Sequence, residues 1–222
     1  MLKTNCNNLT GHLTDIRFLR FLPKNEILIS ACNTKIKFWN AIKGDLEFII
    51  EKIFLLDVAL AVKNDLLVAA GDKLYFFKIK SKKFFSESLE GIATQVFVDP
   101  KEKYLALYIQ SSSEISNSKL KGKIEIWSLE LKEKLWEIET LPDTIIFGFD
   151  PYGKNLGLIS NKTILFLDLK AKKFVKKLEI PKSFRFQNVV YGFNASEYLL
   201  AYLNIHQNSE RPIITRSTQT KI

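Results

Sequence analysis

The sequence is poor in the residues that carry most catalysis and metal binding. Its 222 residues include two histidines, two cysteines, one methionine and nine glycines. The histidines (His12, His206) and the cysteines (Cys6, Cys32) are too scattered for a zinc-ligand spacing. It also lacks the glycine-rich phosphate and dinucleotide motifs and the nucleophile elbow of serine hydrolases. We therefore expect no enzyme, cofactor, metal ion or small-molecule substrate.

The sequence also lacks long apolar segments. No run of about 18 apolar residues is present, so we expect no contact with a membrane. The first eight residues are polar, without the apolar core of a signal peptide, and so few cysteines are typical of a reducing compartment. We expect the protein not to be secreted. Cys32 lies in an apolar strand and is interpreted as a small core residue.

The charge is one-sided. The formal net charge is +9 and the isoelectric point is about 9.4, which draws a protein to polyanions. Lysine, isoleucine, asparagine and phenylalanine are abundant while glycine, methionine and arginine are scarce, and this bias is also typical of an AT-rich coding sequence. Both a functional and a compositional origin of the charge remain open.

One strand motif recurs along the chain. The segment 35–40 (KIKFWN) resembles 73–78, 123–128 and 163–168, and the equivalent residues Trp39, Phe77, Trp127 and Leu167 are spaced by 38, 50 and 40 residues. A polar insertion at 111–122 accounts for the long middle spacing. This period, roughly 40 to 50 residues, is typical of the blades of a β-propeller.

Each period contains further strand-like runs. Two apolar runs precede the recurring motif, and a run of alternating charge follows it, as expected for an outermost strand. Asp99-Pro100 and Asp150-Pro151 predict turns in which the aspartate bonds its own backbone. We expect an all-β fold in which a tail (1–8) precedes a propeller (9–220) of four-stranded blades. The blades are 9–51, 52–90, 91–139, 140–180 and a partial fifth, 181–220, whose third strand is 212–219.

The first blade resembles one family in detail. Gly11-His12 is followed, after two strand-like runs, by the motif that ends in Trp39-Asn40. With this pattern, the chain resembles the WD-repeat (WD40) family across residues 9–205. The resemblance implies a hydrogen-bonded set made of His12, Ser30, Asn33 and Trp39, in which the Asn33 carbonyl replaces the family's aspartate as acceptor. The later blades lack the set, and Trp127 keeps only the tryptophan.

The blade count has its own consequence. Four full blades and a partial fifth describe a small propeller, an open arc completed by a partner, or a fragment of a longer protein. The last two are favoured because most WD propellers have seven blades. An open arc would leave strand edges and apolar faces unpaired at both ends.

Two segments are similar to a narrower group. Residues 9–40 and 62–79 resemble tandem-propeller subunits of the small-subunit processome, which assembles on nascent ribosomal RNA in the nucleolus. The resemblance implies a non-enzymatic scaffold for protein–protein and RNA–protein assembly, located in the nucleus or nucleolus. Two alternatives stay open: a non-catalytic partner subunit of an RNA-modifying enzyme, and a general cytoplasmic WD-repeat adaptor.

Lysines cluster at the turns into two outermost strands. The candidates for contacts to an RNA backbone are Lys80, Lys82, Lys83, Lys170, Lys172, Lys173, Lys176 and Lys177. Repeated blades would place them on one rim, where they would bind phosphate without reading sequence. The alternative is a solvated edge whose lysines prevent strand pairing between molecules.

Overall fold

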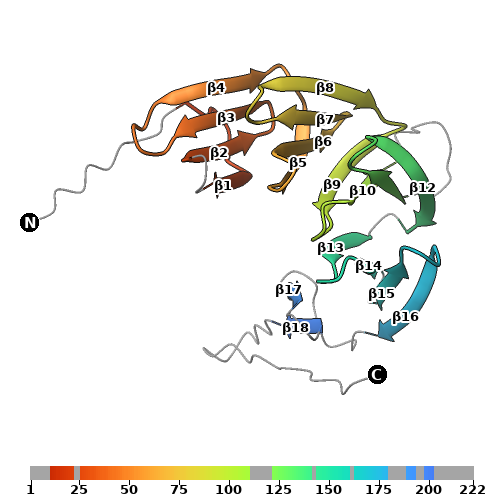
Figure 1. Cartoon of the computed structure of the whole chain (residues 1–222). Coiled ribbons are helices and arrows are strands. Elements are labelled where there is room, and N and C mark those ends of the chain that lie inside the picture. The colour runs from red at the N-terminus through yellow and green to blue at the C-terminus, as the bar shows by residue number, and fades with distance from the viewer. Residues whose placement is uncertain are drawn as a thin grey trace, which may run out of the picture. The chain divides into compact units, whose positions relative to one another are not determined.

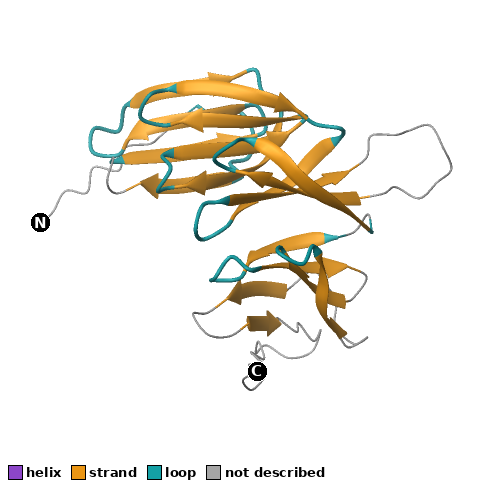
Figure 2. Ribbon diagram, turned by 45° about the vertical axis from the view of Figure 1, so that its right-hand side comes forward, coloured by secondary structure: helices purple, strands orange, loops and turns teal. Residues whose placement is uncertain are grey.

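The fold is built from β-strands. The computed structural model describes residues 11–22, 26–110, 122–141, 144–160, 163–179, 189–193 and 198–202. Every regular element within these ranges is a strand, and no helix occurs there (Figures 1 and 2). The predicted all-β class is therefore confirmed.

Four sheets contain four strands each, in chain order, and neighbouring strands are antiparallel (Figure 1). Sheet 1 contains β1 (Phe18–Leu22), β2 (Ile27–Cys32), β3 (Lys35–Asn40) and β4 (Leu46–Glu51). Sheet 2 contains β5 (Leu55–Ala61), β6 (Leu66–Gly71), β7 (Lys73–Lys78) and β8 (Lys83–Ser88). Sheet 3 contains β9 (Ile92–Val98), β10 (Tyr104–Gln110), β11 (Gly122–Ser128) and β12 (Glu133–Thr140). Sheet 4 contains β13 (Ile145–Phe149), β14 (Asn155–Ser160), β15 (Thr163–Asp168) and β16 (Lys173–Glu179).

The four predicted four-stranded blades thus correspond to four four-stranded antiparallel sheets. In the region of the partial fifth blade, β17 (Val189–Phe193) pairs with β18 (Tyr198–Tyr202). The strand predicted at 212–219 lies outside the described residues, as do the tail 1–8, residues 111–121 of the insertion predicted at 111–122, and His206.

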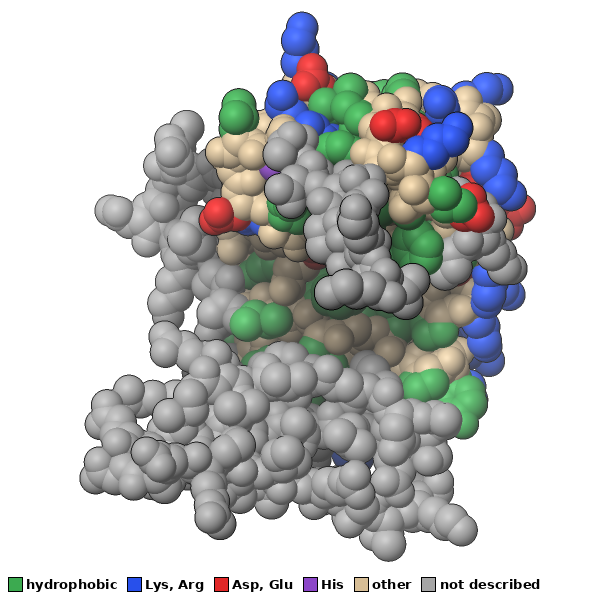
Figure 3. Space-filling model, turned by 90° about the vertical axis from the view of Figure 1, so that its left-hand side faces the viewer, with side chains coloured by type: hydrophobic (Ala, Val, Ile, Leu, Met, Phe, Trp, Pro, Cys, Tyr) green, Lys and Arg blue, Asp and Glu red, His purple; other side chains and the backbone are tan. Residues whose placement is uncertain are grey.

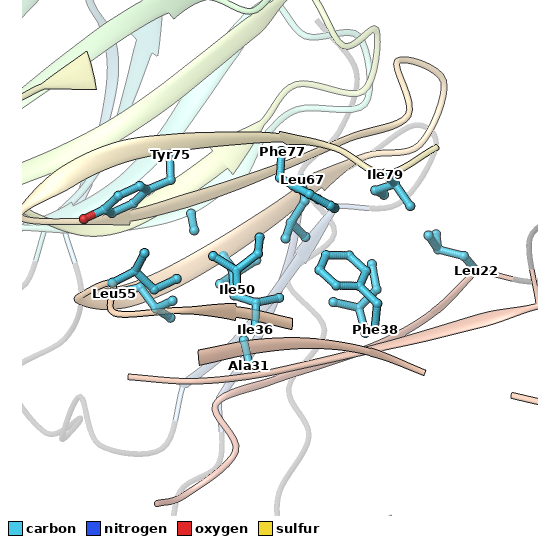
Figure 4. Packing of buried hydrophobic residues seen from close by; sticks show 14 residues of the cluster. Leu22, Ala31, Ile36, Phe38, Ile50, Leu55, Leu67, Tyr75, Phe77 and Ile79 are labelled. Carbon is cyan, nitrogen blue, oxygen red and sulfur yellow. The ribbon is translucent and has the colours of Figure 1, made fainter. Parts of the chain in front are cut away.

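The chain divides into two compact units, Met1–Val96 and Phe97–Ile222. In the first unit, sheets 1 and 2 pack face to face around one apolar cluster. The ring centroids of Phe38 and Phe77 lie 4.7 Å apart, and those of Phe48 and Phe77 lie 5.3 Å apart. Figure 4 shows Phe38 and Ile36 of sheet 1 pointing toward Phe77 and Tyr75 of sheet 2. Alternate residues of β3 therefore face the second sheet.

In the second unit, which begins at Phe97 within β9, sheets 3 and 4 pack in the same way. Ile124 and Ile126 of β11 meet Leu156, Leu158 and Leu167 of sheet 4 in one cluster. In both units, the side chain at the Trp39-equivalent position of the later sheet (Phe77 in sheet 2, Leu167 in sheet 4) faces the earlier sheet. The earlier sheet packs against it with the residues next to the equivalent position on its own third strand. This repeated stacking is consistent with propeller blades.

The two Asp-Pro turns have the predicted hydrogen bonds. Asp99 Oδ1 accepts hydrogen bonds from the backbone N–H groups of Lys103 and Tyr104, both at 2.6 Å. Asp150 accepts from the N–H groups of Lys154 at 2.8 Å and Asn155 at 3.0 Å. Both carboxylates are buried, so they satisfy turn amides that water does not reach.

A left-handed residue recurs at corresponding turns. We call the connection between the first and second strands of a sheet its first turn, and that between the third and fourth strands its third turn. Positive φ angles occur in the first turns at Glu26, Asp65, Glu102 and Gly153, and in the third turns at Gly44, Lys82, Lys132 and Lys172. Only two of these eight residues are glycines. The others are acidic in first turns and lysines in third turns, and a side chain costs about 1 kcal/mol in this conformation.

Glu102 provides a test of this strain. Both Glu102→Gly and Glu102→Ala remove the carboxylate, but only glycine adopts the φ of 57° without a Cβ penalty. We expect the glycine variant to be more stable than the alanine variant by about 1 kcal/mol in urea denaturation. As a control at the corresponding position, Gly153→Ala should lower the denaturation midpoint. Equal stability of the two Glu102 variants would contradict the assigned turn geometry.

Candidate functional site

Three of the four residues in the predicted WD-type set lie together, Ser30 and Trp39 on strands of sheet 1 and His12 in the segment before β1. Trp39 on β3 donates its Nε1–H to Ser30 Oγ on β2 at 2.8 Å. His12 Nε2 lies 2.8 Å from the same hydroxyl oxygen. Ser30 and Trp39 are buried, so the hydroxyl gives the indole N–H an acceptor that water cannot provide.

Asn33 does not join them as expected. The His12 Nδ1 atom is buried and has no hydrogen-bond partner among the described residues, so the predicted bond to the Asn33 side chain is not formed. Instead, the Asn33 main-chain carbonyl accepts from the N–H of Leu55 at 2.9 Å. The physical reason is turn length, because only Asn33 and Thr34 separate β2 from β3. An unpaired buried nitrogen costs about 1–3 kcal/mol.

Lys37 is a member of this site that sequence reasoning missed. Its side chain is only 6% exposed, and its Nζ lies 5.2 Å from the centroid of the Trp39 ring, a cation–π contact. The φ of Gly11 is +126°, a conformation that residues with a side chain rarely adopt, and an added Cβ would also displace the Lys37 ammonium. The glycine of the Gly-His pair is therefore required locally. The available signal was a lysine two residues before a tryptophan in an apolar strand.

Cys32 ends β2 on the same face as Ser30, and it is a free, buried thiol, as predicted. Burial raises the pKa of the thiol. Hydrogen bonds from Thr14, Thr34 and His12 outweigh burial and lower that pKa to about 6. The thiolate form of Cys32 is thus stabilised beside the His12 ring.

Sheet 3 contains a different acceptor for its tryptophan. Trp127 Nε1 donates to Glu125 Oε2 at 2.9 Å, and Glu125 is 2% exposed. The other carboxylate oxygen lies 2.9 Å from Lys123 Nζ and 3.5 Å from Lys134 Nζ. The WD-type set is absent here, as predicted, and an ion-pair network around the buried Glu125 carboxylate replaces it. The alternation Lys-x-Glu-x-Trp in one strand was the signal for it.

Sheet 4 has neither a tryptophan nor a charged residue at the positions of Trp127 and Glu125, where it has Leu167 and Leu165. Thr144 Oγ1 donates to Ser160 Oγ at 3.1 Å, and both residues are buried. A cavity of about 490 Å³ adjoins them, bounded by the end of β12 and by one face of sheet 4. Sequence reasoning did not predict this cavity.

Lys80, Lys82 and Lys83 lie at the third turn of sheet 2 and the start of β8, and all are exposed. The backbone N–H of Lys80 donates to Asp65 Oδ2 at 2.8 Å. Lys82 Nζ lies 5.7 Å from the centroid of the Phe48 ring in sheet 1. Lys82 therefore connects two sheets in addition to carrying charge.

The lysines of sheet 4 are divided between roles. Lys172 Nζ lies 5.9 Å from the centroid of the Trp136 ring in sheet 3, which repeats the Lys82 contact. Lys173 stands opposite Asp168 in the strand register, and Lys170 is exposed in the turn. Lys176 and Lys177 are consecutive on β16 and so point to opposite faces, with Lys177 lining the cavity.

Acidic residues share the end of each sheet with these lysines. First and third turns lie at the same end of an antiparallel four-stranded sheet, and the N–H of Ile79 donates to the Asp65 carbonyl at 3.0 Å between them. Figure 3 shows Lys and Arg side chains gathered at one edge of the face it presents, with Asp and Glu among them. The RNA-binding rim stays a prediction.

One face of sheet 1 exposes large apolar side chains. Leu19 stands opposite Ser30, and Leu46 stands opposite Trp39, in the strand register. Leu19 is 61% exposed, Phe21 on the same strand is 49% exposed and Leu46 is 45% exposed. The corresponding face of sheet 2 is buried against sheet 1. We call these three residues, with Trp39, the Trp39 face.

In the parts of the chain that the structure describes, no three or more His, Cys, Asp or Glu residues gather as a metal-binding group would require. Among the same residues, no helix is long and apolar enough to cross a membrane.

Comparison with known proteins identifies the fold alone. No protein-family model matches the sequence, and no curated protein matches it. By structure, the chain is similar to hydrazine synthase from Kuenenia stuttgartiensis, with a TM-score of 0.62 and 16% sequence identity over 87% of this chain. The match spans 58% of that chain. Because 703 solved chains match, resemblance of fold does not identify a function.

Trp39 and Trp127 differ in the charge of the groups that accept their indole hydrogen bonds, and this difference is measurable. Trp39→Phe and Trp127→Phe each remove an N–H and part of a ring. We expect Trp39→Phe to cost about 1 kcal/mol for its neutral hydrogen bond, and Trp127→Phe about 2–3 kcal/mol because a buried carboxylate loses a donor. Urea denaturation of both variants checks this order. A larger loss for Trp39→Phe would contradict it.

The Cys32 thiol should titrate unusually low. We expect its absorbance at 240 nm to rise with a midpoint near pH 6. Because the folded pKa is depressed below the unfolded value, the contribution to stability is complete above the unfolded pKa of about 9 and is lost as pH falls through about 6. Thr14→Val should raise the pKa more than the control Thr34→Val. A thiol that titrates near 9 in the folded protein would contradict this.

Proposed function

We propose that this chain is a non-catalytic WD-repeat scaffold of the propeller type that binds other proteins, within a complex that assembles ribosomes. The observation that carries the proposal is the Trp39 face. Leu19, Phe21 and Leu46 are large, apolar and 45–61% exposed, where the matching face of sheet 2 is buried by a neighbouring sheet. Exposed apolar surface of this kind marks a site of protein interaction.

The buried polar groups support the same proposal. Ser30 and Glu125 accept from tryptophans, and Asp99 and Asp150 accept from turn amides. Each of these buried side chains makes a hydrogen bond that stabilises the fold. The function that we propose therefore depends on residues at the surface. The His12–Ser30–Trp39 arrangement supports the WD-repeat assignment, since it is the arrangement that the sequence resemblance implies.

Contact with an RNA backbone is a second element of the proposal. Lys170 lies in the third turn of sheet 4 and Lys173 begins β16, both are exposed, and neither has an aromatic contact of the Lys172 kind among the described residues. Contacts of this type bind phosphate without reading bases, and their strength falls steeply with salt. The alternatives are a partner subunit of an RNA-modifying enzyme and a cytoplasmic adaptor. They differ in which proteins would bind to the chain.

Affinity capture of the full chain from its own cells tests the proposal. We expect pre-ribosomal proteins to be retained by the wild type and by the control Leu131→Glu, which changes a residue that is 64% exposed in a third turn. The double variant Leu19→Glu/Phe21→Glu should reduce retention roughly tenfold or more. It replaces the apolar side chains that would give most of the binding free energy with carboxylates, and a carboxylate is costly to bury in an apolar contact.

The other outcomes separate the alternatives. A single RNA-modifying enzyme, or trafficking or ubiquitin-ligation proteins, would replace the ribosomal assignment with the corresponding alternative. Retention that the double variant leaves unchanged would remove the Trp39 face from the proposal. RNA retention that neither salt nor Lys170→Glu/Lys173→Glu reduces would remove the RNA contact.

A further inference from the structure

Lys37 is a buried cation that lacks a counter-charge. Its side chain is 6% exposed, and among the described residues its ammonium makes no hydrogen bond or ion pair. The ring centroid of Trp39 lies 5.2 Å from Nζ, but a cation–π contact leaves the positive charge uncompensated. Lysines are almost never buried this deeply unless they are paired, because a charge removed from water is costly.

Sheet 3 treats a charge at the same position differently. Glu125 stands two residues before the tryptophan of β11, as Lys37 does in β3, and it is 2% exposed. One of its carboxylate oxygens lies 2.9 Å from Lys123 Nζ and 3.5 Å from Lys134 Nζ. Two lysines of the same sheet thus offset the charge of Glu125. Sheet 1 has the opposite charge at this position without the corresponding acids.

The strands beside Lys37 do not offer it an acid. In the strand register, Lys37 stands opposite Ser30 of β2 and Ile49 of β4. Glu51, at the end of β4, pairs with Lys35 at 2.8 Å. This pair is the main reason that the pKa of Glu51 is lowered, and Lys37 adds a smaller coulombic contribution. A counter-charge for Lys37 is thus left for a bound molecule to provide.

The ammonium is accessible from the Trp39 face. Alternate residues of a strand point to the same side, so Lys37 lies on the same face of β3 as Trp39. Its Nζ retains accessible surface, in contrast to the buried His12 Nδ1. Leu19 on β1 and Leu46 on β4 are 61% and 45% exposed, and β3 lies between these two strands. A molecule that packs on both leucines therefore crosses the strand that carries Lys37.

The surroundings of Lys37 favour a protein over a nucleic acid. Leu19, Phe21 and Leu46 make the Trp39 face apolar. A phosphate backbone would lose its hydration against these side chains. A protein segment places its own apolar side chains there and one carboxylate on the ammonium, so that apolar contacts surround a desolvated charge pair. A neutral acceptor, such as a main-chain carbonyl, would leave the lysine charge uncompensated.

We propose that the Trp39 face binds an acidic and apolar segment of a partner protein, whose aspartate or glutamate pairs with Lys37. The flanking apolar side chains of that segment pack on Leu19, Phe21 and Leu46. The inference rests on the proposed function for the existence of a partner, and it adds the chemical character of the segment that is bound. Because the apolar contacts exclude water, the attraction between the two charges is stronger than at an exposed site. The face thus selects its partner by charge as well as by hydrophobicity.

Synthetic peptides test the charge preference without a natural partner. The full chain is titrated with the blocked peptide Ser-Leu-Phe-X-Phe-Leu-Ser, in which X is Asp, Asn or Lys. The indole N–H signal of Trp39, assigned with Trp39→Phe, and the methyl signals of Leu19 are followed by NMR. We expect saturable shifts with the Asp peptide, about tenfold weaker binding of the Asn peptide and no saturable shift with the Lys peptide. Equal affinity of the Asp and Asn peptides, or no saturable shift with the Asp peptide, would overturn the proposal.

Lys37→Met separates the charge from the shape of the face. It removes an unpaired buried charge and keeps an unbranched side chain, so we expect the urea denaturation midpoint to stay near that of the wild type. Its affinity for the Asp peptide should fall about tenfold, to that for the Asn peptide. Lys37→Arg keeps a cation and should keep the preference. So should the control Lys43→Met, which removes an exposed lysine from the third turn of sheet 1. A folded Lys37→Met that still prefers the Asp peptide would overturn the assigned ion pair.

A uridine pentanucleotide, titrated at the same ionic strength, tests a nucleic acid as the occupant. We expect no saturable shift of the Trp39 indole signal, because the apolar side chains around Lys37 oppose the burial of phosphate. Tighter binding of the pentanucleotide than of the Asp peptide, with shifts at Trp39 and Leu19, would overturn the assignment of a protein segment to this face.

The capture experiment separates this inference from the proposed function. We expect Lys37→Met to reduce the retention of proteins about tenfold, as the loss of a charged hydrogen-bond donor implies. If Lys37→Met retains pre-ribosomal proteins as the wild type does, the acidic partner is excluded and the scaffold proposal stands. If the Asp peptide is preferred but no protein is retained, the scaffold proposal fails and the charge preference of the Trp39 face remains.

Discussion

The structure depends on the burial of one sheet's apolar face by the next. All six residues of β6 are buried, so this strand needs cover on both of its faces, which a single sheet cannot provide. In the first unit, the contact between Phe38 and Phe77 provides cover on one face, and in the second unit the contacts of Ile126 and Leu167 play the same part. Stability is therefore a property of a pair of sheets, while turns and outer strands remain free to vary and to carry function.

Much of this arrangement could be predicted from the sequence, because strand periodicity and turn chemistry are local. The apolar runs and the Asp-Pro turns led to four four-stranded sheets with aspartates bonded to their own turns. The Asn33 contact failed because a shorter turn moves its amide away from His12, and a pattern of residue types does not measure that displacement. The Lys-x-Glu-x-Trp alternation places a charged residue beside Trp127, and side-chain geometry identifies Glu125 as the acceptor for the indole N–H.

The sheets solve one chemical problem in three ways. An indole N–H buried at the Trp39 position needs an acceptor, because leaving it unpaired would cost about 1–3 kcal/mol. Sheet 1 provides a neutral hydroxyl, and sheet 3 provides a carboxylate that two lysines then have to neutralise. Sheet 4 has Leu167, which needs no acceptor. Leucine in place of tryptophan removes the need for an acceptor, and it also removes the volume of the ring. The cavity at sheet 4 lies where sheet 1 has its His12–Ser30–Trp39 cluster.

The distribution of charge argues that the basic character of the chain is not a uniform attraction for polyanions. In first turns the left-handed residue is acidic at Glu26, Asp65 and Glu102, and the adjoining third turns have lysines. At physiological ionic strength, charges interact strongly only within about 8 Å, so an acid in the neighbouring turn offsets a lysine at the same end of a sheet. Lys82 and Lys172 are further occupied by aromatic rings of the preceding sheet. The net charge of +9 already subtracts these acids, so a contact with a phosphate backbone depends on the lysines beyond these turn pairs, where the positive charge is in excess.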